Sequence, residues 1–206
     1  MMSISPITLQ GTHVILEPPA ERHLADLLAA SQRDEIWVYL PFGPYRTIDE
    51  WRAAIQRWRE QAGQGSSTSF VIVRRSDERA VGMTAYLDIQ PKNRALEIGG
   101  TWLTPEVQHS AINTECKYLL LRHAFETLGC VRVQLKTDAR NLRSQRALER
   151  LGAVKEGVLR KHVLTRGGYQ RDTVMYSIVD SEWHAVKERL EGFLKRSEQS
   201  TGNGQQ

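Results

Sequence analysis

The turn before the helix expected at about 114–128 has residues and a position that could hold a phosphate. A strand expected over 95–103 ends at Leu103, a turn follows through 104–106, and the six residues QHSAIN (108–113) lead into the helix. The first turn of a helix presents unpaired backbone N–H groups and a partial positive charge, which together attract anions. Because every helix has such an end, this pattern alone indicates a phosphate site only weakly.

A carboxylate on the same strand is a candidate for accepting a proton. Glu97 alternates with Leu96 and Ile98, so its side chain should point away from the core face that these two residues occupy. In that position it could take up a proton through a water molecule during a reaction. The alternative interpretation is an ordinary solvated carboxylate on a strand.

The loop at 36–47 has four aromatic side chains beside glycine and proline residues. Pro41, Gly43 and Pro44 break regular structure there, so the rings belong to an irregular segment. Such a segment is typical either of a wall of a substrate pocket or of a small hydrophobic cluster under the loop. The four candidate pocket residues are Trp37, Tyr39, Phe42 and Tyr45.

The elements that must position these residues follow from the hydrophobic periodicity. Period-two runs separated by turn residues indicate strands, and apolar residues at helical spacing indicate helices. Strands are expected at 12–17, 69–74, 80–88, 95–103, 130–137, 154–164 and 169–179, and helices at 20–30, 47–61, 114–128, 142–151 and 181–196. Gly129 and Gly152 follow two of these helices, where a left-handed cap is usual. The pattern predicts an α+β domain with a mixed sheet.

The composition is that of one folded domain. The 206 residues are 40% hydrophobic and 25% charged, which suits a chain that buries its own core. We assign residues 1–196 to this domain. The last ten residues, 197–206, include no apolar residue, and we expect them to be a disordered tail.

Charge, cysteines and hydropathy limit the expected partners and compartment. No membrane-spanning stretch or secretion signal is visible, so a cytoplasmic location is expected. Cys116 and Cys130 lie in apolar periodic segments without metal-ligand spacing, so we expect reduced core cysteines and no metal site. The formal net charge is +4, with both signs interspersed, which does not favour nucleic-acid binding. The arginine-rich helix at 140–150 keeps that function as a hypothesis, which a steep salt dependence of affinity would support.

Residues 101–152 resemble the core of the GNAT superfamily of N-acetyltransferases, in particular its RimJ/RimL-like branch. The run NTECKYLLLRHAFETLG (113–129) closely resembles the helix of this branch, which usually reads N-T-E-A-K followed by leucines. The run DARNLRSQRALERLG (138–152) includes the family's N-x-x-S motif, a helix and a terminal glycine. The resemblance implies a GNAT-like fold with a mostly antiparallel sheet flanked by helices. It also implies acetyl transfer from acetyl-CoA to a primary amine, either a protein or peptide N-terminus or a small-molecule amine.

The resemblance further implies which residues bind acetyl-CoA. In this family an Arg or Gln opens a glycine-rich pyrophosphate loop, and Gln108 matches the opening position. The main chain of 102–104 would bind the pantetheine arm, and the N-x-x-S motif would lie beside it where the sheet opens. The implied acetyl-CoA-binding residues are Trp102, Leu103, Thr104, Gln108, His109, Ser110, Ala111, Ile112, Asn113, Thr114, Asn141 and Ser144.

Three residues are candidates for catalysis. Ser144 is the candidate acid for the departing thiolate, because RimL-like enzymes that lack the family's tyrosine use this serine, and Leu148 occupies the tyrosine's position here. Glu97 is the candidate base. Tyr176 lies in the segment DTVMY, which resembles a strand of this branch, and is expected to line the acceptor site. The alternatives are a local hydrogen bond on the helix for Ser144 and simple packing for Tyr176.

Departures from the family pattern support a second hypothesis. His109, Ala111 and Asn113 replace the loop's usual glycines, which let the backbone approach the pyrophosphate without obstruction. Because the tyrosine is also absent, a non-catalytic acyl-CoA-binding or sensor domain of the same fold is the alternative. GNAT domains often pair as homodimers, and the apolar stripe of the closing helix, 181–196, would form such an interface or pack on the chain's own core.

Overall fold

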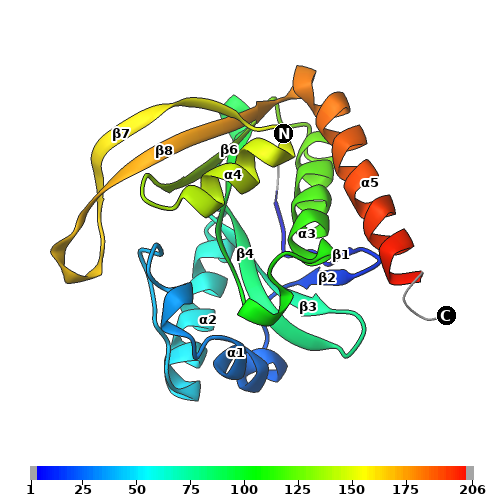
Figure 1. The fold of residues 1–206 in the computed structure, drawn as a ribbon. Coiled ribbons are helices and arrows are strands. Elements are labelled where there is room, and N and C mark those ends of the chain that lie inside the picture. The colour runs from blue at the N-terminus through cyan, green and yellow to red at the C-terminus, as the bar shows by residue number, and fades with distance from the viewer. Residues whose placement is uncertain (1–3, 203–206) are drawn as a thin grey trace.

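A mixed β-sheet with helices on both faces forms the frame of the protein (Figure 1). The computed structural model describes residues 4–202. Within them the strands are β1 (Leu9–Gln10), β2 (Val14–Glu17), β3 (Thr68–Arg74), β4 (Arg79–Gln90), β5 (Ala95–Leu103), β6 (Arg132–Asp138), β7 (Val154–Leu164) and β8 (Gln170–Val179). The α-helices are α1 (Leu24–Ala30), α2 (Ile48–Gly63), α3 (Ala111–Arg122), α4 (Leu142–Leu151) and α5 (Asp180–Gly202). A π-helical segment, His123–Thr127, continues α3.

The strand order in the described part of the chain is β1-β2-β3-β4-β5-β6-β8-β7. Neighbouring strands are antiparallel except β5 and β6, which run parallel. A parallel pair needs a crossover connection, and α3 lies in the connection between β5 and β6. The predicted fold class, a mixed and mostly antiparallel sheet flanked by helices, is therefore confirmed.

The sheet opens between β5 and β6. Their ladder covers only residues 95–97 opposite residues 132–134, although β5 continues to Leu103 and β6 continues to Asp138. Beyond the ladder the backbones of these two strands are no longer paired with each other. The edges that face this opening can therefore bind something else.

A β-bulge in β5 lies beside this opening. The register of β4 and β5 shifts between Met83 and Ala85, so that Gly100 and Thr101 both lie opposite one residue of β4. Gly100 has a φ of 61°, in the left-handed region that glycine enters without steric penalty. The bulge also reverses the alternation of side chains along β5.

Two hydrophobic clusters cover opposite faces of the sheet. The larger includes residues of α3, α4 and α5, and Leu96 and Ile98 of β5 belong to it. The smaller includes residues of α1 and α2, and Trp102, which follows the bulge, belongs to it. Trp183 and Leu190 of α5 are buried in the larger cluster. The apolar stripe of the closing helix therefore packs on the chain's own core.

Local signals in the sequence explain where several helices begin and end. Thr47 accepts a hydrogen bond from the Glu50 backbone N–H at 3.2 Å and caps α2. Gly129 and Gly152 have φ values of 65° and 105°, which confirms the predicted left-handed caps. Cys116 and Cys130 are buried thiols, as predicted. None of the helices described in the structure has an apolar stretch long enough to cross a membrane.

The observed elements differ from the predicted ones mainly at their ends. β1 was not predicted, because two residues are too few for a periodic pattern. α3 begins at Ala111 rather than Thr114, because Ser110 caps it by accepting a hydrogen bond from the Ile112 N–H at 3.3 Å. α5 continues to Gly202. The described part of the predicted disordered tail is therefore helical, and residues 203–206 lie outside the described residues.

The buried Glu115 of the N-T-E-C-K run attaches α3 to the first hairpin. Its carboxylate accepts hydrogen bonds from the backbone N–H groups of Thr12, His13 and Val14 at 2.7, 2.7 and 2.8 Å. Hydrogen bonds to a buried carboxylate are stronger than those between neutral groups. This glutamate therefore fixes the position of α3, whose first turn borders the opening in the sheet.

Candidate active site

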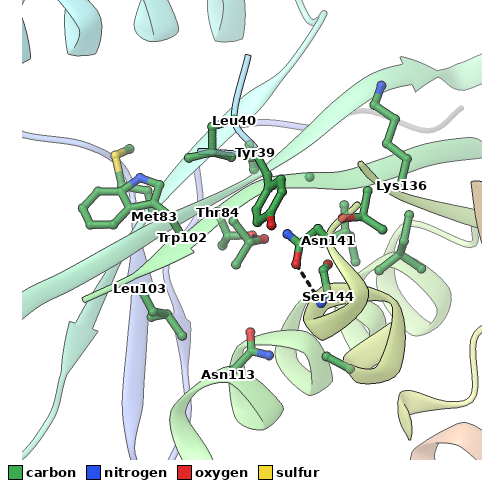
Figure 2. Close-up of a pocket in the computed structure, with 18 of the residues that line it drawn as sticks. Tyr39, Leu40, Met83, Thr84, Trp102, Leu103, Asn113, Lys136, Asn141 and Ser144 are labelled. Carbon is green, nitrogen blue, oxygen red and sulfur yellow. Dashed lines mark hydrogen bonds between the residues drawn. The ribbon is translucent and has the colours of Figure 1, made fainter. Parts of the chain in front are cut away.

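A cavity of about 520 Å³ fills the opening between β5 and β6 and continues along the first turns of α3 and α4. The loop before α2 closes it from the other face of the sheet. Figure 2 shows side chains from these separate segments converging on one space, where Tyr39 and Asn141 point toward one another and Thr84 and Ser144 lie nearby. The fold therefore builds one site from residues that are far apart in the sequence.

The wall at the start of α3 has the features of an anion site. Ser110 is the N-cap and binds the Ile112 N–H, which leaves other N–H groups of the first turn available. Arg143 of α4 donates a hydrogen bond to Gln108 Oε1 at 2.7 Å, and the Gln108 amide donates to the Leu103 carbonyl at 3.2 Å. The positive end of the helix and the guanidinium together favour a phosphate here.

His109 has a backbone conformation that is unusual for a side chain of its size. Its φ is 64°, in the left-handed region that glycine favours, although histidine enters it more often than most residues. This residue stands where the family pattern has a glycine. The loop therefore follows a glycine-like path despite the substitution, and the His109 side chain is exposed at the cavity wall.

α4 presents Ser144 to the cavity. Asn141 caps this helix, and its Oδ1 accepts a hydrogen bond from the Ser144 backbone N–H at 3.1 Å (Figure 2). Within residues 4–202, we find no hydrogen bond made by the Ser144 hydroxyl. The alternative role expected for Ser144 was a local hydrogen bond of its hydroxyl. The local bond is made by its backbone N–H instead, so the hydroxyl is available to a ligand. Leu148, one turn further along, is buried and apolar.

Two buried carboxylates line the wall made by β5 and β6, and each has its own cation. Glu97 is only 1% exposed and forms an ion pair with Lys136 at 2.8 Å, so it is not the solvated carboxylate considered as an alternative. Asp138 is equally buried and binds Arg140 at 2.9 Å. Burial by itself would raise the pKa of Asp138, but hydrogen bonds from Arg140 outweigh it and hold that pKa below its usual value.

Lys117 of α3 is a buried amine at the cavity wall. It is 5% exposed, and its Nζ donates a hydrogen bond to Thr101 Oγ1 at 2.6 Å. Thr101 in turn is hydrogen-bonded to Thr84 at 2.9 Å. Within the described part of the chain Lys117 has no ion-pair partner. Burial therefore lowers its pKa from 10.5 to about 8.

Most of the predicted site residues line this cavity. These residues are Tyr39, Phe42, Glu97, Trp102, Leu103, Gln108, His109, Ser110, Asn113, Thr114, Asn141 and Ser144. Six others do not line it, namely Trp37, Tyr45, Thr104, Ala111, Ile112 and Tyr176.

Tyr176, which was expected to line the acceptor site, does not line this cavity. It is 0% exposed, and its hydroxyl donates a hydrogen bond to Glu149 Oε1 of α4 at 2.9 Å. Side chains alternate along β8, so Tyr176 shares the face of Ile178 in the larger cluster, whereas Arg171 and Thr173 share the other face. Burial and the bond to Glu149 raise the pKa of Tyr176 to about 12. This phenol is a packing residue, which was the alternative interpretation.

Other predicted residues are part of the frame. The Thr104 N–H donates to the Val81 carbonyl of β4 at 2.8 Å and is not available to a ligand. Trp37 and Tyr45 pack edge to face, with ring centroids 5.6 Å apart, in the smaller cluster. Ala111 and Ile112 lie in the first turn of α3, and Ile112 is buried in the larger cluster.

Several polar residues of the cavity were not predicted. They include Thr84, Thr101, Lys117, Lys136, Asp138, Arg143, Arg150 and Arg171. Lys117 could have been found, because it follows Asn113 by four residues and so lies on the same face of α3. Arg143 and Arg150 belong to the arginine-rich helix considered as a nucleic-acid surface. Nothing in the sequence near Arg171 indicates that it lines a cavity, apart from its spacing of two residues from Thr173 on the same strand.

Comparison with known proteins gives a consistent result. Residues 13–154 match the family model described as "Acetyltransferase (GNAT) domain". The chain is similar to YdaF of Bacillus subtilis (strain 168), provisionally named a ribosomal N-acetyltransferase, with 28% identity over 174 residues that cover 84% of this chain and 93% of YdaF. A crystal structure from T. thermophilus, provisionally described as an acetyltransferase, has 41% identity and a TM-score of 0.84, covering 94% of this chain and 100% of that chain. Mycobacterium smegmatis RimJ in complex with CoA-disulfide has the same fold, with 21% identity, a TM-score of 0.80, and coverage of 91% and 94%.

Proposed function

Because this chain belongs to the GNAT acetyltransferases and is an N-acetyltransferase, we propose that it transfers the acetyl group of acetyl-CoA to a primary amine in the cavity between β5 and β6. The observation that carries this proposal is the opening in the sheet. It connects a helix start that suits phosphates on one face with buried carboxylates and an aromatic loop on the other. The two substrates can therefore approach the same point from opposite sides.

The residues along α3 and β5 fit the phosphates and the pantetheine arm of acetyl-CoA. The backbone N–H groups of Ala111 and Asn113, together with Arg143, are donors for the pyrophosphate. In a strand the N–H and the carbonyl of one residue point to the same edge of the strand. The Leu103 carbonyl accepts a hydrogen bond from Gln108, so the Leu103 N–H faces that side as well. That side is the opening, where β6 no longer pairs, and the Leu103 N–H is a donor for the pantetheine arm.

The reaction requires positioning, removal of a proton from the amine, a donor for the carbonyl oxygen, and a proton for the departing sulfur. Acetyl-CoA supplies the acetyl group as an activated thioester. Glu97 accepts the proton of the acceptor's ammonium group through water, and Lys136 fixes the position of this carboxylate. The bulge at Gly100 and Thr101 leaves backbone N–H groups for the carbonyl oxygen. Ser144 donates its hydroxyl proton to the sulfur and recovers one from solvent.

A non-catalytic acyl-CoA-binding or sensor domain is the second candidate function. Two observations favour it. Leu148 places an apolar side chain at the position of the family's tyrosine, and His109 stands where the phosphate loop has a glycine. This second function predicts that acetyl-CoA binds without subsequent release of its thiol.

Calorimetric titration with acetyl-CoA, followed by thiol release in the same sample, tests both functions. The acceptors are a panel of peptides, polyamines and aminoglycosides. Micromolar binding with amine-dependent thiol release supports the enzyme. Binding without release for every amine supports the sensor, and absence of binding overturns both.

A charge introduced at the start of α3 tests the phosphate site. Asn113 is the third residue of α3, and Asn113→Glu completes a Ser-x-x-Glu capping box with Ser110, so the helix should be retained. The new carboxylate would repel the pyrophosphate, and we expect acetyl-CoA affinity to fall at least about tenfold. Ala53→Glu, on the exposed face of α2, adds the same charge elsewhere and should leave affinity unchanged. Wild-type affinity in Asn113→Glu would show that the phosphate site is assigned wrongly.

A further inference from the structure

The acceptor end of the cavity has a buried cation without an ion-pair partner. Arg171 of β8 is 4% exposed and lines the cavity. β8 pairs with β6 so that Thr173 lies opposite Asp138, and the alternation of strands places Arg171 on the same face as these two residues. This is also the face of Glu97, the proposed base. Arg171 therefore faces the region where the acceptor amine is expected.

The guanidinium of Arg171 has more donors than the protein uses. Its Nε donates to Thr173 Oγ1 at 3.0 Å, and one terminal nitrogen donates to the Tyr39 carbonyl at 3.5 Å. An arginine has five N–H donors in a planar fork that matches a carboxylate. Within residues 4–202, no carboxylate lies within ion-pair distance of Arg171. The hydrogen bond to the Tyr39 carbonyl is also long, so the terminal N–H groups of the guanidinium remain available to a ligand.

The carboxylates nearest to Arg171 already have their own cations. Asp138 binds Arg140 at 2.9 Å, and Glu97 binds Lys136 at 2.8 Å. Both act on Arg171 only as charges at longer range, and burial lowers the pKa of its guanidinium against their influence. The two pairs are neutral, so Arg171 leaves a net positive charge at this end of the cavity.

A buried charge is expensive unless an opposite charge or a ligand compensates for it. The remaining acidic residue of the cavity wall, Glu35, is exposed and lies in the loop before α2. Arg171 and Lys117 are thus two buried cations of the cavity wall without an ion-pair partner among the described residues, whereas Lys136 and Arg140 already neutralise the two buried carboxylates. A ligand with a negative charge would complete the balance.

Building on the proposed function, we propose that the acceptor is an amine that also carries a carboxylate, and that the open edge of the Arg171 guanidinium binds this carboxylate. The carboxylate can belong to a free amino acid or to an acidic residue near the N-terminus of a peptide. A polyamine or an aminoglycoside would instead require carboxylates without cations of their own. Glu97 and Asp138 do not offer them, because both are paired, and Glu35 is an exposed carboxylate rather than part of the buried wall.

Matched acceptors that differ only in this carboxylate test the proposal. In the peptide arm, Ser-Glu-Ala amide is compared with Ser-Gln-Ala amide. In the small-molecule arm, glycine, β-alanine and 4-aminobutyrate are compared with their carboxamides at equal concentrations of the unprotonated amine. Binding of each acceptor to the CoA-loaded protein is measured by calorimetry, and acetyl transfer is measured separately by thiol release.

A hydrogen-bonded pair between a carboxylate and a buried guanidinium should favour the acid over its amide by roughly 10- to 100-fold in at least one arm. The arm that shows this preference identifies the source of the carboxylate. In Arg171→Gln the preference should fall toward one, and in Arg171→Lys it should fall partly, because a lysine keeps the charge without the fork. Arg160→Gln, an exposed change on the neighbouring β7, should keep it.

The calorimetric comparison in the wild-type protein decides the proposal even if the Arg171 variants do not fold. Equal binding of acid and amide, stronger binding of a diamine, or no binding in either arm overturns it. An acid preference that persists in a folded Arg171→Gln overturns the assignment to Arg171. Thiol release with amides or diamines alone would refute this inference and keep the enzyme. Absence of release from every amine would instead count against the proposed function.

Discussion

Replacing Lys117 with methionine tests the electrostatic description of the cavity wall. Methionine has a similar length but no amine, so Lys117→Met removes a buried charge and the hydrogen bond to Thr101. Thr101 keeps its hydrogen bond to Thr84 and is not left without a partner. The substitution therefore changes mainly the electrostatic free energy of one group.

The expected magnitude follows from the shifted pKa. Burial lowers the pKa of Lys117 from 10.5 to about 8, and each unit corresponds to roughly 1.4 kcal/mol. The buried ammonium thus lowers the free energy of unfolding by about 3 kcal/mol at pH 7, where it is protonated in both states. The lost hydrogen bond offsets about 1 kcal/mol of this. We expect Lys117→Met to be more stable than the wild type by about 2 kcal/mol at pH 7.

The sign of the pH dependence follows from proton linkage. Between pH 8 and 10.5 the unfolded chain binds more protons at this site than the folded chain, so this lysine makes wild-type stability rise with pH. By pH 9.5 the wild type should recover about 2 kcal/mol, and its difference from Lys117→Met should nearly vanish. Burial also raises the pKa of Cys116 to about 12 and that of Cys130 to about 11, which lowers stability above pH 9. Comparing the two proteins at the same pH cancels this effect.

Urea unfolding at pH 7 and at pH 9.5 measures this difference. Lys92→Met, at an exposed turn, is the control and should follow the wild type at both pH values. A stability difference between Lys117→Met and the wild type that is the same at pH 7 and at pH 9.5 would refute the reasoning. It would mean that the Lys117 amine does not change its protonation in this range.

Two further substitutions separate catalysis from stability. Ser144→Ala should lower kcat by about 10²- to 10⁴-fold, the usual contribution of a positioned acid, and leave the calorimetric affinity for acetyl-CoA unchanged; an unaltered kcat would exclude Ser144 as the acid. Glu115→Gln should destabilise the protein by about 3 kcal/mol, because an amide cannot accept all three buried backbone bonds, and thermal unfolding should then begin roughly 6–12 °C lower. Glu106→Gln, at an exposed position, should leave the melting temperature unchanged, and an equal melting temperature for Glu115→Gln would contradict its proposed role.

The parts of the site that depend on local structure could be predicted from the sequence. Asn141 and Gly152 mark the two ends of α4, and the observed helix begins and ends between them. These signals are reliable because a cap forms hydrogen bonds within a few residues of its own position. Ser110 caps α3 in the same local way, but it was not predicted as a cap, and the start of this helix was predicted three residues too late. The frame of the proposed acetyl-CoA site is local in this sense.

The parts that depend on which face of the sheet a side chain takes could not be predicted. Strand alternation separates Tyr176 from Arg171, but alternation alone does not say which of the two faces the acceptor. Packing of α4 on β8 decides this, because Glu149 binds the Tyr176 hydroxyl and buries it. The bulge at Gly100 has the same consequence for β5, where it turns Trp102 to the face opposite Leu96. The two glycines at 99 and 100 indicate an irregularity in β5, but they do not say to which face the following side chains turn.

The chemical state of the cavity residues depends on neighbours that are distant in the sequence. Glu97 is paired because Lys136 lies on the adjacent strand at the same face, a relation set by the short parallel ladder of β5 and β6. Arg171 has no ion-pair partner among the described residues, because Asp138 on the neighbouring strand β6 binds Arg140 instead. A count of acidic and basic residues in the sequence includes all of these groups and reveals none of these pairings. We therefore expect the charge that remains after pairing, rather than the residue types alone, to select the acceptor of this acetyltransferase.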